Sequence, residues 1–149
     1  MKPSPRDEGI RWLLQARQDL DDARYAQDGK RFNLACFLAQ QAAEKAIKGY
    51  LYARGRTLVI GHSVARLCQD ATALDSTFED LRQRAAPLDK YYIPTRYPNG
   101  LPGGVPFEAF DQADANRALD LAQHVIGFVE NRFPSEEAPP NESGGEEDG

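Results

Sequence analysis

The stretch LACFLAQQAAEKAIKGYLYAR, from Leu34 to Arg54, decides the fold class of this chain. Apolar side chains recur along it at the spacing of one helix face, which predicts an amphipathic α-helix. Asn33 is a candidate N-cap for this helix, and Gly55 is a residue at which it can stop. The apolar stripe consists of Phe37, Leu38, Ala42, Ile47, Tyr50 and Leu51.

A second face of the same stretch is polar. Gln41, Glu44 or Lys45, and Lys48 follow one another at intervals of three or four residues, so they share one side of the helix. Glu44 precedes Lys48 by four positions, which is the favourable order for an ion pair along a helix. Alanines on the opposite side let a neighbouring helix approach closely. On spacing alone, the polar residues form either a solvated face over a packing seam or part of a functional site.

Capping residues and apolar spacing predict four more helices. These helices cover about residues 5–28, 63–68, 77–87 and 111–133. Ser4 before Pro5 starts the first of them, and Ser76 with Glu79 forms a capping box for the third, which Pro87 bends or ends. The segment TLVIG is a connector. Because no βαβ alternation or repeat is present, the predicted fold class is all-α, a bundle of four to five helices.

Composition divides the chain into a helical domain, residues 1–133, and an acidic tail, residues 134–149. Hydrophobic residues make up 41% of the chain and charged residues 28%, as in ordinary soluble domains. The tail holds six of the 23 acidic residues and no basic one, a composition that predicts disorder. Without it, 18 basic residues face 17 acidic ones, so the net charge of −5 becomes about +1 for the domain.

Several classes of protein are disfavoured by the sequence. No apolar run approaches the roughly 20 residues that span a bilayer. The first residues, MKPSPRDEGIRW, lack the apolar core of a signal peptide. Cys36 and Cys68 are too few and too isolated for a disulfide framework. We therefore expect a cytoplasmic protein without a membrane segment and with two reduced, buried thiols.

The loop LDKYYIPTRYPNGLPGG, from Leu88 to Gly104, precedes the last predicted helix. Prolines on both sides of Arg96 stiffen the backbone around it. A stiffly held arginine beside Tyr92 and Tyr97 suits recognition of a phosphate together with a base. Alternatively, the tyrosines close one end of the bundle while Arg96 pairs with a carboxylate.

His62 raises the possibility of catalysis. A histidine can take the proton of an RNA 2′-hydroxyl while a nearby arginine, here Arg54 or Arg56, steadies the phosphate without a metal ion. The same position also suits a histidine that caps or packs against the following helix. His124 lies inside the last predicted helix beside apolar residues, which favours the edge of the core. Two distant histidines and two distant cysteines do not predict a metal site.

Taken together, these pieces resemble the HEPN family, the helical nucleotide-binding domains of prokaryotes and higher eukaryotes. The resemblance covers residues from Arg11 to about Phe133 and rests on FLAQQAAEKAIKGYL, GHSVARL and YYIPTRYPNG, in this order. It implies an antiparallel four- to five-helix bundle, usually a homodimer, here with a structured Tyr/Pro/Arg loop before the last helix. Members of the family commonly work beside a minimal nucleotidyltransferase, frequently as a toxin–antitoxin pair, and many bind or cut RNA.

Members that cut RNA resemble one another in an arginine followed, after four to six residues, by a histidine on a helix. Arg56 and His62 have this spacing, but the TLVIG between them is not a helical sequence. Arg117 and His124 have it within a predicted helix, with the apolar Ala118 where the family carries a polar residue. The resemblance therefore implies a domain that is non-catalytic or at most weakly catalytic.

The predicted function is binding of a nucleotide, RNA or a nucleotidyltransferase partner, with no cofactor or metal. A metal-independent endoribonuclease toxin and a structural dimerisation module are the alternatives. The predicted binding residues are Lys45, Lys48, Arg54, Arg56, Tyr92, Arg96 and Tyr97. We also expect the loop and the second helix to form one unit, in which Arg96 lies within ion-pair reach of Glu44.

Overall fold

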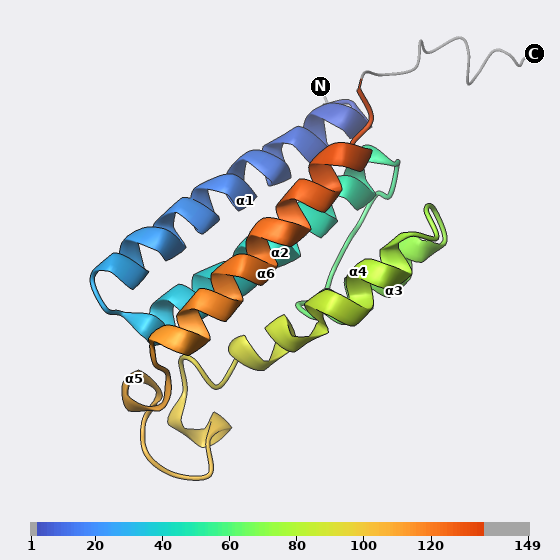
Figure 1. Ribbon diagram of the computed structural model, residues 1–149. Coiled ribbons are helices and arrows are strands. Elements are labelled where there is room, and N and C mark those ends of the chain that lie inside the picture. The colour runs from blue at the N-terminus through green and yellow to red at the C-terminus, as the bar shows by residue number, and fades with distance from the viewer. Residues whose placement is uncertain (1–2, 136–149) are drawn as a thin grey trace, which may run out of the picture.

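The computed structural model describes residues 3–135, and within them the chain forms helices and no strand (Figure 1). The α-helices are α1 (Pro5–Asp28), α2 (Phe32–Ala53), α3 (Val64–Thr72), α4 (Phe78–Ala85), α5 (Pro106–Ala109) and α6 (Gln112–Arg132). Two 3₁₀ helices are η1 (Ala86–Tyr91) and η2 (Pro98–Gly100). The predicted all-α fold class is confirmed. The predicted disorder of the acidic tail falls on residues outside the described range, from position 136 onward.

Three long helices, α1, α2 and α6, lie side by side along the length of the molecule (Figure 1). Only the short turn of residues 29–31 joins α1 to α2, so these two helices are antiparallel. α2 is the central element, because α1, α3, α5, α6 and η1 all contact it. Its fully buried residues include Ala35, Ala39, Ala42, Ala43 and Ala46. These small side chains let several neighbours pack around one helix.

The backbones of α1 and α2 meet at two glycines. A Cβ atom at Gly9 would lie 2.5 Å from the carbonyl oxygen of Gly49, and one at Gly49 would lie 2.9 Å from that of Gly9. Neither position can hold a larger residue unless the helices move apart, because protein interiors are close-packed. The expectation that a neighbouring helix comes close to this stretch is confirmed.

The first two helices begin and end partly as the sequence predicts. The Ser4 hydroxyl accepts a hydrogen bond from the backbone N–H of Asp7 and caps α1. α2 ends just before Gly55, whose φ of +102° favours glycine. The predicted N-cap at Asn33 is wrong, because α2 already begins one residue earlier. The Asn33 side-chain amide donates instead to the backbone carbonyl of Thr95 at 3.1 Å and ties α2 to the loop.

α3, α4 and η1 form a second layer that packs on α2 and α6. Ser63, the first residue of the helix predicted over residues 63–68, is the N-cap of α3 and accepts a hydrogen bond from the backbone N–H of Arg66. The predicted capping box of Ser76 and Glu79 is wrong, because Thr77 is the N-cap of α4, no side chain caps the helix, and the Glu79 carboxylate pairs with Arg82. Pro87 ends α4, as expected, since the chain continues there as η1.

Candidate functional site

Amide and charged side chains are buried along one face of α2. Gln40, Glu44 and Lys48 are all buried, a rare environment for such residues. The Lys48 ammonium lies 2.9 Å from Oε2 of Glu44, one helical turn away. The side-chain amides of Gln40 and Gln41 donate to Oε1 of Glu44 at 3.3 and 3.2 Å. The polar face expected from the sequence is therefore a buried network centred on Glu44.

His62 lies over this network at the end of the connector between α2 and α3. Its Nδ1 is 3.1 Å from Oε2 of Glu44, and its backbone carbonyl accepts a hydrogen bond from Gln40 at 2.8 Å. Its ring stacks on Tyr92 with the centroids 4.6 Å apart. An ionised carboxylate can only accept, so Nδ1 is the donor in this contact. The side chain is 56% exposed, so His62 is the most exposed member of the network.

Gly61 and Asp89 shape the segment that carries His62 into α3. Gly61 has a φ of +103°, which lets the connector turn into α3. Asp89 of η1 accepts hydrogen bonds from the Ser63 hydroxyl and from the backbone N–H of Val64, both at 2.6 Å. A carboxylate at this end of a helix is favourable because of the helix dipole. No local sequence signal points to this role of Asp89, because its partner Ser63 lies 26 positions earlier in the chain.

The Arg96 guanidinium packs among aromatic side chains. Its Cζ atom lies 4.3, 4.6 and 5.0 Å from the ring centroids of Phe37, Tyr92 and Tyr97. Its Nε donates a hydrogen bond to the backbone carbonyl of Tyr92 at 2.9 Å. Cation–π attraction to the rings holds the charge in place. Within residues 3–135 no carboxylate forms an ion pair with Arg96.

The predicted ion pair of Arg96 with Glu44 is therefore wrong. Lys48 and His62 already occupy the Glu44 carboxylate. The Arg96 guanidinium instead lies on the rings of Phe37, Tyr92 and Tyr97, and Tyr92 also stacks on His62. The loop does dock on α2 as expected, but through stacked side chains instead of opposite charges.

The other predicted basic residues do not gather on one surface. Lys45 forms an ion pair with the buried Asp19 at 2.6 Å, and Lys48 is buried against Glu44. Arg54 and Arg56 are exposed, just beyond the C-terminal end of α2. These four basic residues are thus divided between ion pairs along α2 and the C-terminal end of that helix.

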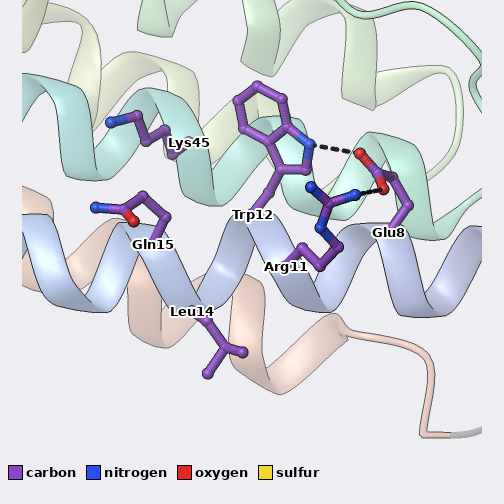
Figure 2. A pocket seen from close by; sticks show the side chains of 6 residues that line it. All are labelled: Glu8, Arg11, Trp12, Leu14, Gln15 and Lys45. Carbon is purple, nitrogen blue, oxygen red and sulfur yellow. Dashed lines mark hydrogen bonds and ion pairs between the residues drawn. The ribbon is translucent and has the colours of Figure 1, made fainter. Parts of the chain in front are cut away.

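A pocket of about 520 Å³ opens between α1 and α2 (Figure 2). It is lined by Glu8, Arg11, Trp12, Leu14, Gln15 and Lys45. The Trp12 indole donates to Glu8 at 3.0 Å, its ring stacks on Tyr52, and the Lys48 ammonium lies 5.7 Å from its centroid. No local sequence signal singles out Trp12, because an aromatic residue at helical spacing usually belongs to the core. Its place beside the Glu44 network depends on how α1 packs on α2.

Neither predicted arginine–histidine pair is joined by a hydrogen bond or ion pair in the described part of the chain. Arg56 lines hollows at the end of α2, whereas His62 contacts Glu44 near the middle of that helix. Arg117 and His124 lie on α6, two turns apart. Burial lowers the pKa of the His124 imidazole, and the positive charge of Arg84 lowers it further.

A metal-binding cluster or a reactive thiol among the side chains of residues 3–135 could support catalysis. No cluster of three or more His, Cys, Asp or Glu side chains in residues 3–135 could hold a metal ion. Burial raises the pKa of both Cys36 and Cys68 to about 12, so the thiols stay protonated and unreactive. No helix in the same range is long and apolar enough to cross a membrane.

The geometry defines a class of protein, a helical bundle in which an arginine-bearing aromatic loop docks beside a buried polar network on the central helix. The sequence model of the HEPN domain matches residues 10–132, and the chain therefore belongs to the HEPN domain family. No curated protein shows a significant match to the chain.

Three solved structures are similar to this one. TT1696 from Thermus thermophilus is 44% identical, with a TM-score of 0.79 over 84% of this chain and 98% of its own. ST0689, an archaeal HEPN homologue, is 37% identical, with a TM-score of 0.71 over 90% and 100% of the two chains. An HEPN domain protein from Thermotoga maritima is 25% identical, with a TM-score of 0.64 over 85% and 99%.

Proposed function

We propose that this HEPN domain binds nucleotides or RNA, without cutting them, at a surface formed by His62, Tyr92, Arg96 and Tyr97, here called the Arg96 surface. The observation that carries the proposal is the state of the Arg96 guanidinium. Three aromatic rings and one backbone carbonyl hold it in place, while no carboxylate of the described residues neutralises its charge.

The Arg96 surface offers groups for both parts of a nucleotide. The terminal nitrogens of Arg96 have no hydrogen-bond partner within residues 3–135, and a guanidinium matches the oxygens of a phosphate in a two-pronged contact. Tyr97 is 50% exposed, so its ring is available for stacking on a base. The partly exposed His62 adds a hydrogen-bonding group at the same place. Because Arg96 is already oriented, binding costs little further ordering.

The proposal includes the partners that the family suggests. We propose a cytoplasmic homodimer in which the Arg96 surface is also the candidate contact for a minimal nucleotidyltransferase, as one half of a toxin–antitoxin pair. Membership of the HEPN family supports these points.

A metal-independent endoribonuclease is the second candidate, and the contact between His62 and Glu44 favours it. A buried carboxylate that fixes one imidazole nitrogen leaves the other free to act as a base. Arg96, however, lies on the Tyr92 ring, which also stacks on His62. The arginine would have to hold the scissile phosphate past that ring, and for this reason we prefer binding to cleavage.

The binding proposal predicts that Arg96→Gln weakens binding of a labelled single-stranded RNA about tenfold, measured by fluorescence anisotropy. A lost hydrogen bond to a charged group costs roughly 1.5–3 kcal/mol, and 1.4 kcal/mol is a factor of ten in Kd. Arg84→Gln is the matched control, since Arg84 is an exposed arginine of α4 outside the Arg96 surface, and its binding should not change. Equal affinity of Arg96→Gln and the unchanged chain, with equal melting temperatures, would contradict the proposal.

The same samples distinguish binding from cleavage. We expect the RNA to be recovered intact after incubation. Cleavage that persists in a chelator and is lost in His62→Ala would instead establish the second candidate, because that result requires His62 as the proton-transfer group.

A further inference from the structure

Two exposed arginines stand at the end of the bundle where the described chain ends. Arg56 has no hydrogen-bond or ion-pair partner for its side chain among residues 3–135, and Arg54 donates only to the hydroxyl of Tyr50. We call Arg54, Arg56 and the backbone between them the Arg56 surface. It is separate from the Arg96 surface, which lies on the N-terminal half of α2.

The chain leaves the last helix close to this surface. The backbone carbonyl of Pro134 accepts a hydrogen bond from Nε of Arg6 at 2.7 Å, which ties the end of α6 to the first turn of α1. A hollow of about 410 Å³ lies between the start of α1 and the end of α2. Glu8 and Arg56 are among the residues that line it. Figure 1 shows the chain passing out of α6 at this end of the bundle.

The acidic segment 136–149 has the charge that complements the Arg56 surface. Residues 136–149 carry six acidic side chains and no basic one. The acidic side chains that line the same hollows as Arg56 form no ion pair with it. Glu8 already accepts hydrogen bonds from Arg11 and Trp12, and Asp70 lines a hollow with Arg56 without forming an ion pair.

We propose that the acidic segment 136–149 binds the Arg56 surface of its own chain and shields these arginines from other anions. A segment tethered next to its site acts at an effective concentration in the millimolar range, so a few weak ion pairs are enough to populate the contact. This inference does not depend on what the Arg96 surface binds.

The test measures how fast a dicarbonyl reagent modifies each arginine of the full-length protein, read by peptide mass spectrometry. The variant replaces the six acidic side chains by their amides: Glu136→Gln, Glu137→Gln, Glu142→Gln, Glu146→Gln, Glu147→Gln and Asp148→Asn. We expect Arg54 and Arg56 to react about two- to fivefold faster in the variant, the range expected for one or two exposed ion pairs. Arg84, exposed on α4, is the internal control and should react equally in both proteins.

Two further conditions sharpen the test. High salt should remove the difference between the two proteins, because exposed ion pairs are screened. Equal rates for Arg54 and Arg56 in low salt would overturn the proposal. Protection that disappears on dilution would also overturn it, since the acidic segment would then come from a second copy.

Discussion

Glu44 is the residue on which the polar contacts of α2 converge. Its buried carboxylate receives Lys48, His62 and the side-chain amides of Gln40 and Gln41. Removing one partner of a buried pair leaves the other charge without compensation, which costs more than the pair itself contributes. Glu44 therefore links the stability of the bundle to the position of His62 beside the Arg96 surface.

At this scale we predict that Glu44→Gln lowers the free energy of unfolding by about 3–5 kcal/mol, because Lys48 stays buried without a counter-charge. Urea titration followed by circular dichroism measures the change. Adding Lys48→Met should restore most of the loss, since neither charge is then buried. Glu79→Gln is the control, because Glu79 also pairs with a basic residue of its own helix but on the exposed side of α4, and it should have little effect. Equal losses for the two glutamates would exclude a special role for burial.

At the scale of elements, the contact of α1 with α2 depends on the absence of side chains. Gly9 and Gly49 face each other across the interface, and each would place a Cβ atom within 3 Å of the other's carbonyl oxygen. Glycine inside a helix is ordinarily unfavourable by about 1 kcal/mol relative to alanine. Close packing of the two helices outweighs that cost here.

We predict that Gly9→Ala destabilises the protein by about 1–3 kcal/mol, the usual effect of overpacking a core. Gly127→Ala in α6 is the matched control, because a Cβ atom there meets no atom within 4 Å. That variant should be stabilised by up to about 1 kcal/mol through helix propensity alone. Thermal unfolding of the two variants should therefore shift in opposite directions. A stabilised Gly9→Ala would mean that the helices separate without cost.

At the scale of the whole molecule, stability depends on how the layer of α3 and α4 packs on α6. His124 and Phe128 of α6 face this layer, where Phe128 meets Phe78 edge to face with centroids 5.0 Å apart. Burial and the charge of Arg84 lower the pKa of His124 below its ordinary value of 6.5. The folded protein therefore resists protonation of this ring, whereas the unfolded chain does not.

We predict that the free energy of unfolding falls as the pH drops from about 6.5 through the lower folded-state pKa of His124. In that window the unfolded state binds more protons than the folded state, so acid favours unfolding. Well above pH 6.5 the His124 ring is neutral in both the folded and the unfolded state, so its protonation no longer lowers the free energy of unfolding. Urea titrations between pH 7.5 and pH 5 should show a shallower dependence for His124→Gln than for the unchanged chain. If the free energy of unfolding depends on pH equally in both proteins, the burial of His124 does not affect stability in this range.

The sequence by itself determined the features that depend on residues close together in the chain. Helical spacing from Leu34 to Arg54 predicted α2, and Ser4 predicted the start of α1, because periodicity and capping act over one or two turns. The prolines around Arg96 predicted a structured loop, and the order of the three motifs FLAQQAAEKAIKGYL, GHSVARL and YYIPTRYPNG indicated the HEPN family. The wrong caps at Asn33 and Ser76 show the limit of such signals, since these side chains or their partners found competing contacts.

The tertiary structure alone decided which side chains meet. The Glu44 carboxylate pairs with Lys48, one helical turn away, and with His62 of the connector. Arg96 packs on aromatic rings instead. Asp89 and Trp12 gained their roles from segments that are distant in sequence. A charge has no preferred partner in sequence, because attraction depends on distance and burial, and only the packing of helices sets these. For this reason the sequence predicted the helices of this protein, and the fold determined its site.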